Sequence, residues 1–251
     1  MSQRVGTIEK FLVTLLDNGS RLQGPAVAKY VDRVRRSHPD ESPAQIIERL
    51  EKMFLTGVTG SGSAVGAAAA FPGVGTLTAV GAVGAETVFF LEASALLTLA
   101  VASVHGIEPH DHEQRRALVF AVALGETGME VVSKATGVAM KNWSSAVTGK
   151  IPGAQLRIVN NSLVKKFVRK YFAKRSALIL GKLVPAGVGA VIGGAGNRAL
   201  GKRTISNART AFGPAPARWP VGPDQRTALG PDQRTALPRT NLSGTAPVDG
   251  S

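Results

Sequence analysis

Residues 53–85 carry no charged side chain, and this uncharged stretch restricts the fold more than any other feature of the chain. It contains eight Gly, eight Ala and six Ser or Thr, with Pro72-Gly73 near its middle. Residues this small let helix backbones approach one another closely. Proline breaks or kinks a helix. We therefore expect an apolar hairpin of two closely packed helices, over residues 53–71 and 75–104.

The uncharged length of this stretch is also that of a membrane-spanning segment. Its Gly, Ser and Thr residues favour membrane insertion only weakly, however. Gly62 and Gly66 form a small-xxx-small pair, and Gly189 and Gly193 form another in a second small-residue segment over residues 183–197. These four glycines are predicted helix-packing residues, and whether lipid or protein covers the helices stays open at this point.

The remaining pattern predicts an all-α fold, a compact helical domain over residues 1–213. Short amphipathic helices are expected over residues 6–16 and 26–37, the second directly after Pro25, and a third begins with Ser42 as N-cap and Pro43 at its first position. Later helices are expected from Asp111 to about Thr136, over 157–175 and over 199–212, with an irregular connection at 141–156.

Residues 214–251 form a Pro-rich tail that is predicted to be disordered. The eight residues of 222–229, Gly-Pro-Asp-Gln-Arg-Thr-Ala-Leu, are repeated at 230–237. Such a segment buries too little apolar surface to offset its ordering entropy.

Charge is distributed very unevenly along the chain. Residues 1–130 contain 11 Lys or Arg and 14 Asp or Glu, whereas residues 131–223 contain 16 Lys or Arg and no acid. A long basic stretch favours a polyanionic partner, either anionic lipid or nucleic acid. We consider nucleic acid the weaker of these, because aromatic residues for base stacking are few and no binding module is apparent.

The basic helix over residues 157–175 carries the clearest functional signal. Val164, Phe167, Val168, Tyr171 and Phe172 share one arc, and cations occupy the other side. This pattern suits a membrane interface, although a core helix with a solvated face shows the same pattern. The predicted membrane- or anion-binding residues are Lys165, Lys166, Phe167, Arg169, Lys170, Tyr171, Lys174 and Arg175.

Several short motifs carry a resemblance to a known family. They are Leu55-Thr56-Gly57, Gly60-Ser61-Gly62, Phe71-Pro72-Gly73, Phe90-Leu91-Glu92, Leu183-Val184-Pro185 and Ala208-Arg209-Thr210-Ala211-Phe212. In this order and spacing they resemble the EcsC protein family over about residues 40–213. The resemblance implies a helical, membrane-related bacterial protein, from a family named after an operon that also encodes an ABC transporter. It supplies no catalytic residues, and this chain has His105-Gly106 where the family typically has Tyr-Gly.

Catalytic chemistry has only weak candidates in the sequence. Glu86 and Glu92 lie in uncharged surroundings, where a carboxylate needs a partner or a raised pKa. Arg198 and Lys182 are the candidate partners, and structural pairing is favoured over catalysis. The alternative is a soluble enzyme that uses one of these acids in a small-residue pocket.

No cofactor or metal is expected. The run from His110 to Glu113 follows Pro109 at a helix start, where Asp caps and Glu favours the helix dipole. The chain has no cysteine, which excludes disulfides and thiolate metal sites, and no export signal is visible. We therefore expect a membrane-associated protein on the cytoplasmic side of the cell membrane, peripheral or shallowly inserted, which assists or regulates a membrane complex. An integral hairpin and a cytosolic location are the alternatives.

Overall fold

The computed structural model describes residues 26–68, 76–139, 142–149, 152–182 and 188–220. All of them except Pro220 belong to a structural unit that ends at Trp219, and a second unit begins at Pro220. Every regular element in the described ranges is helical, which confirms the predicted all-α fold. The expected helix over residues 6–16 and the tandem repeat lie outside the described residues.

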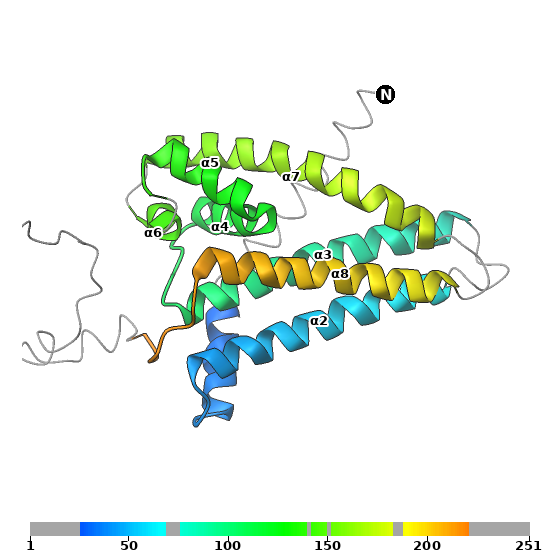
Figure 1. The fold of residues 1–251 in the computed structure, drawn as a ribbon, viewed down its shortest axis with the longest axis horizontal. Helices are drawn as coiled ribbons and strands as arrows, with labels where there is room; N and C mark the ends of the chain where they lie inside the picture. The colour runs from blue at the N-terminus through cyan, green and yellow to red at the C-terminus, as the bar shows by residue number, and fades with distance from the viewer. Residues whose placement is uncertain (1–25, 69–75, 140–141, 150–151, 183–187, 221–251) are drawn as a thin grey trace, which may run out of the picture. The chain divides into compact units, whose positions relative to one another are not determined.

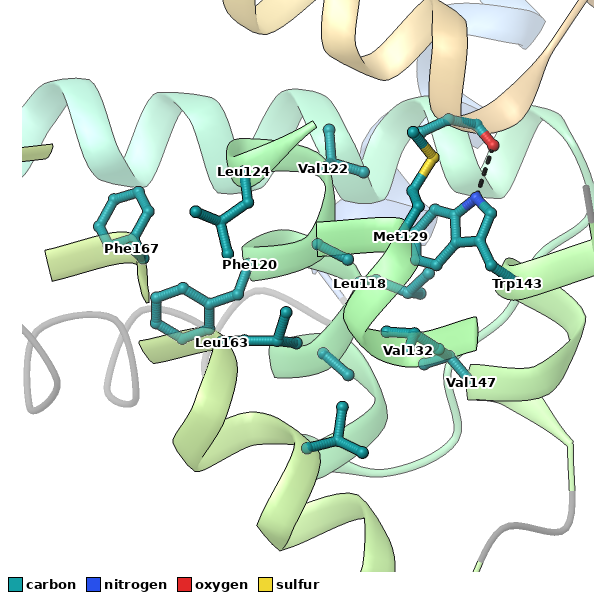
Figure 2. Close-up of a cluster of buried hydrophobic side chains, with 14 of the residues drawn as sticks. Leu118, Phe120, Val122, Leu124, Met129, Val132, Trp143, Val147, Leu163 and Phe167 are labelled. Atoms are coloured by element: carbon teal, nitrogen blue, oxygen red, sulfur yellow. Dashed lines mark hydrogen bonds between the residues drawn. The ribbon is translucent and has the colours of Figure 1, made fainter. Parts of the chain in front are cut away.

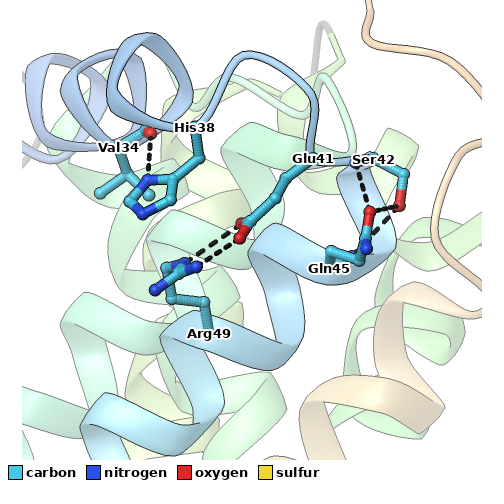
Figure 3. A network of polar contacts seen from close by, with 6 residues as sticks. All are labelled: Val34, His38, Glu41, Ser42, Gln45 and Arg49. Atoms are coloured by element: carbon cyan, nitrogen blue, oxygen red, sulfur yellow. Dashed lines mark hydrogen bonds and ion pairs between the residues drawn. The ribbon is translucent and has the colours of Figure 1, made fainter.

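Helix α2 (Pro43–Ala68) begins with a reciprocal cap, shown in Figure 3. The Gln45 amide donates to the Ser42 hydroxyl at 3.4 Å, and the Ser42 amide donates to the Gln45 side-chain oxygen at 2.8 Å. This arrangement satisfies two backbone donors that a helix start leaves unpaired. The predicted N-cap at Ser42, with Pro43 in the first helical position, is confirmed.

A helix over residues 26–37 precedes α2, as the sequence predicts. His38 closes it, because its Nδ1–H donates to the Val34 carbonyl at 3.0 Å (Figure 3). In the loop that follows, Glu41 forms an ion pair with Arg49 of α2. The hydrogen bond from this guanidinium lowers the pKa of the Glu41 carboxyl.

Helices α3 (Thr76–Val104) and α8 (Val188–Phe212) pack against α2 (Figure 1). The two expected apolar helices are present, but the first is only the C-terminal part of the long α2. They pack against each other, as expected, but α8 is the more extensive neighbour of α2 among the described helices. A Cβ added to Gly62 of α2 or to Gly194 of α8 would collide with the other helix, so these glycines allow the close approach of the two helices.

An ion pair joins the N-terminal half of α2 to the C-terminal half of α8. Glu51 is only 6% exposed, and both of its oxygens accept hydrogen bonds from the Arg209 guanidinium. This pairing raises the pKa of Arg209 above its ordinary value. A buried carboxylate needs a charged partner. The pair therefore fixes the register in which α2 packs along α8.

A second group of helices packs around a separate core, shown in Figure 2. It comprises α4 (His112–Leu124), α5 (Glu126–Thr136), α6 (Trp143–Thr148) and α7 (Gly153–Lys182). We call its buried cluster the α4–α7 core; among its largest members are Leu118, Phe120, Leu124, Trp143, Leu163 and Phe167. The rings of Phe120 and Phe167 meet edge to face at 5.3 Å. The indole of Trp143 donates to the Ala211 carbonyl at 2.8 Å, which ties α6 to the end of α8.

Helix α4 starts as predicted but ends early. Asp111 accepts a hydrogen bond from the Gln114 amide at 2.8 Å, which confirms the expected cap. The expected continuous helix to Thr136 is wrong, because Gly125 (φ 68°) ends α4 and α5 starts directly afterwards. A side chain at Gly125 would also collide with Asn207 of α8, so only glycine fits this break.

The expected irregular connection at 141–156 is wrong in part. It contains α6, and α7 begins at Gly153, before the predicted basic helix 157–175. Trp143 and Val147 lie one turn apart, and both are buried in the α4–α7 core. Burial of these two residues stabilises a short helix where the neighbouring Gly and Pro residues indicated none.

The domain extends further than residue 213. Ala215 and Trp219 pack against the core between α2 and α3, and the Arg35 guanidinium lies 4.7 Å from the centre of the Trp219 ring. The prediction that the tail begins at residue 214 is therefore wrong, since residues 214–219 belong to the folded unit. Apolar burial and the cation–π contact anchor a segment whose prolines exclude a helix.

Candidate functional site

Helices α2 and α8 touch through their glycines. A Cβ added to Gly62 would lie 2.5 Å from the Gly193 carbonyl oxygen, closer than real contacts allow. A Cβ on Gly194 would collide with the Ser63 hydroxyl. The predicted packing role is thus seen for Gly62 and Gly193. The other glycine of each pair is Gly66 or Gly189, and the surroundings of these two lie outside the part of the chain that the structure describes.

A buried polar contact lies beside this glycine contact. Asn197 of α8 is fully buried, and its Nδ2 donates to the Val58 carbonyl of α2 at 2.9 Å and to the carboxylate of Glu86 on α3. Three helices are therefore joined at one side chain. No role was predicted for Asn197, although it continues the four-residue spacing of Gly189 and Gly193 and so shares their helix face.

Glu86 accepts a hydrogen bond from the Asn197 amide, and its expected pairing with Arg198 or Lys182 stays a prediction. Arg198, one residue after Asn197, is exposed, and the side chain of Lys182 lies outside the description. Glu86 itself is 4% exposed and joins the helices, which agrees with a structural role. Glu92, the other weak catalytic candidate, is half-buried on the same helix. It lies nearly two turns from Glu86, and the two acids form no carboxylate pair suited to acid–base work.

Around this junction, the described surface of the three helices is uncharged. We call residues 56–65 of α2, 85–91 of α3 and 191–197 of α8 the apolar tip. Its exposed members are Thr56, Gly57, Gly60, Ala64, Ala85, Phe89, Val191 and Ala195. Val191 is 72% exposed and Phe89 is 44% exposed. The only charged residue within these ranges, Glu86, is buried.

The apolar tip lies at one end of the three helices. The end of α2 and the start of α3 are separated by residues 69–75, and the end of α7 and the start of α8 by residues 183–187. Figure 1 shows these four helix ends on the same side of the domain. Beyond the tip, the exposed surface of α8 becomes positively charged. Its next exposed side chains include Arg198, Lys202 and Arg203.

Helix α7 carries further cations toward the same end. Lys165 and Arg169 are exposed, and Lys166 is half-buried. Phe167 is not available to a membrane, because its ring is 6% exposed and packs on Phe120 in the α4–α7 core. The expectation that this aromatic faces lipid is therefore wrong, since the same amphipathic pattern serves core packing. The side chains of Lys170, Tyr171, Lys174 and Arg175 lie outside the description.

One helix in the described residues is long and apolar enough to cross a membrane. It is the stretch Ala85–Val104 of α3, with a mean hydropathy of 1.9. However, 61% of it is buried among the other helices, as in the core helix of many proteins. Its composition alone therefore does not distinguish a membrane span from a core helix.

The run from His110 to Glu113 serves the helix start. The His110 amide donates to the Gln114 side chain at 2.7 Å, beside the Asp111 cap. Glu113 accepts a hydrogen bond at 2.6 Å from Asn160, which is fully buried in α7. These contacts join α4 to α7 and account for the polar residues that first suggested a metal site.

Comparison with known proteins does not assign this chain to a family. No family model matches the chain, and neither the curated proteins nor the solved structures include a significant match.

Proposed function

We propose that this protein is a membrane-associated helical protein that inserts its apolar tip into the cytoplasmic leaflet and assists or regulates a membrane complex there. The observation that carries the proposal is that every exposed side chain of the tip lacks charge, on three different helices. Large contiguous apolar patches are rare on soluble monomers and indicate an interaction site. The resemblance to the EcsC family points in the same direction.

The dimensions of the tip suit shallow insertion. Helix α8 rises by about 14 Å between Val188 and Asn197, at 1.5 Å per residue. The hydrocarbon layer of one leaflet is about 15 Å thick, half of the bilayer core. Asn197 then lies near the depth where the headgroups begin, and the glycine contact at Gly193 lies about halfway into the leaflet. The Asn197–Glu86 hydrogen bond stays inside the protein.

Cations lie where a negative leaflet would meet them. Arg198, Lys202 and Arg203 follow the tip along α8, and Lys165 and Arg169 lie exposed on α7. Each such cation contributes about 1 kcal/mol near an anionic surface. Nothing in the described structure favours the enzyme alternative, because Glu86 is used to join helices.

Two matched substitutions test the insertion of the tip. Val191 and Ile158 are exposed apolar residues, 72% and 68% respectively, but Val191 belongs to the tip and Ile158 lies near the start of α7. Val191→Asp should reduce co-sedimentation with anionic vesicles at least tenfold, because a charge inside the bilayer costs up to about 3 kcal/mol. Ile158→Asp should leave it almost unchanged.

The same assay separates insertion from surface attraction. Lys165→Gln with Arg169→Gln should weaken binding about 30-fold at low salt, at about 1 kcal/mol per cation, and less at high salt. Circular dichroism should show all variants folded. Equal pelleting of the wild type and Val191→Asp would refute insertion of the tip.

A further inference from the structure

One exposed face of α8 changes from apolar to cationic along its length. The exposed side chains on this face are those of Val191, Ala195, Arg198 and Lys202. At about 100° per residue, these four positions share an arc of about 60°. Arg198 and Lys202 are therefore neighbours one turn apart, on the same face of α8 that the apolar tip exposes.

The position of this cation pair along α8 corresponds to the headgroup layer. If the tip inserts as proposed, with Val188 near the midplane and α8 along the membrane normal, Arg198 lies about 15 Å and Lys202 about 21 Å from the midplane. The headgroup layer of one leaflet extends from about 15 Å to about 22 Å. Both cations then lie at the level of the lipid phosphates, and Val191 lies in the hydrocarbon.

The neighbouring helices place no exposed acid beside the pair. The α2 residues that a side chain at Gly201 would contact belong to the uncharged stretch that begins at residue 53. Helices α7 and α8 contain no acid at all. On α3, Glu86 is buried in its hydrogen bond to Asn197, and Glu92 lies about 120° around that helix from Glu86.

The next cation on the same face of α8 differs in this respect. Arg209 lies about 10 Å beyond Lys202 and is neutralised by Glu51. Neither Arg198 nor Lys202 forms an ion pair with an acid in the part of the chain that the structure describes. Two cations next to the tip are thus available to an anionic ligand.

The spacing of the pair suits a single phosphate group. Side chains at positions i and i+4 lie about 6 Å apart at their Cβ atoms, so a guanidinium and an ammonium can both reach one phosphate. A phosphomonoester carries a charge of about −1.5 to −2 at neutral pH, whereas the phosphodiester of most lipids carries a single charge.

We propose that Arg198 and Lys202 bind the phosphomonoester headgroup of a lipid of the phosphatidic acid class. The two cations match the two charges of that headgroup, and the apolar tip holds them at its depth. This proposal rests on the insertion of the tip proposed above.

Vesicles that differ in headgroup but not in surface charge test the proposal. Phosphatidylcholine vesicles are prepared with either phosphatidic acid or phosphatidylglycerol and matched in zeta potential. At about pH 8 the wild type should bind the phosphatidic acid vesicles about tenfold more tightly, because charge-assisted hydrogen bonds to the phosphomonoester add to surface attraction. At about pH 5, where the phosphomonoester holds its second proton, this preference should shrink.

A matched pair of cations provides the control. Arg198→Gln with Lys202→Gln should remove the preference for phosphatidic acid. Lys165→Gln with Arg169→Gln removes another exposed or half-exposed i,i+4 cation pair, on α7, and should weaken binding to both vesicles while the preference stays. Circular dichroism should show all variants folded.

The outcomes separate this site from the insertion of the tip. Equal binding of the wild type to both vesicles, or a preference that survives Arg198→Gln with Lys202→Gln, would overturn the headgroup site and leave insertion intact. A preference lost equally in both double variants would also overturn it. If Val191→Asp bound vesicles as well as the wild type, insertion itself would fail, and the headgroup site with it.

Discussion

The α4–α7 core and the apolar tip are both built from packed helices, but different side chains hold them together. In the core, large rings and branched side chains such as Trp143, Phe120 and Leu163 are almost fully buried. In the tip, α2 and α8 meet through Gly62 and Gly193, where the absence of side chains allows the contact.

The two regions also differ in what they leave on the surface. Around the α4–α7 core, most apolar groups point inward, with Ile158 as an exposed exception, and other exposed positions include Glu130, Lys134 and Lys165. At the tip, Val58, Phe90 and Leu91 are buried, but Phe89 and Val191 stay exposed. Close glycine packing is typical of helices in lipid, where burial of large apolar groups offers no advantage. The comparison therefore supports different surroundings for the two ends of one domain.

The largest expected effect is in the α4–α7 core. Trp143→Ala should cost about 3–5 kcal/mol, because it leaves a cavity and removes the hydrogen bond to the Ala211 carbonyl. For a chain of this size that lowers Tm by about 10 °C or more. Val191→Ala, a substitution of an exposed residue at the tip, should change stability by less than about 0.5 kcal/mol. Thermal unfolding of both variants measures the contrast, and similar shifts would contradict it.

A smaller effect tests the glycine contact of the tip. Gly62→Ala should destabilise the fold by about 1–3 kcal/mol, because the added Cβ forces α2 and α8 apart. Gly60 lies one half-turn earlier with open space around it. Gly60→Ala should stabilise the protein by up to about 1 kcal/mol through helix propensity. If both substitutions stabilised the protein, the close approach of the helices at Gly62 would be wrong.

Local signals in the sequence predicted helix starts well. The caps at Ser42 and Asp111 depend on residues three positions away, so they are readable without the fold. The break at Gly125 could not be predicted in this way, because isolated glycines are tolerated within helices. The side chain that would collide with any larger residue at this position is Asn207, which belongs to α8.

The faces that the helices use for packing were predictable from the sequence, but the residues that meet across them were not. The spacing of Gly62, Gly189 and Gly193 identified packing faces, yet no local pattern shows that Glu86 meets Asn197 from more than one hundred residues away. For α7, the apolar arc was visible, but the same segregation of apolar and charged residues arises whether protein or lipid covers the arc. The burial of Phe167 therefore required the structure.

The smallest expected effect concerns charge around the α4–α7 core. Glu130 and Lys134 form an i,i+4 ion pair at 2.6 Å on the exposed side of α5. The hydrogen bond from Lys134 lowers the pKa of Glu130 below its ordinary value of 4.5, and Lys166 of α7 adds to this. A carboxylate with a lowered folded-state pKa stabilises the fold above the unfolded pKa, and this contribution is lost as pH falls through the folded value. Glu130→Gln should thus lower Tm by about one degree at pH 7, and the two melting curves should converge below pH 4.5. In a Lys134→Gln background the difference should shrink, and salt should reduce it because both side chains are exposed. A constant difference from about pH 7 to about pH 3 would show that the pair does not cause it. No such effect is expected from the tip, because its exposed surface carries no carboxylate.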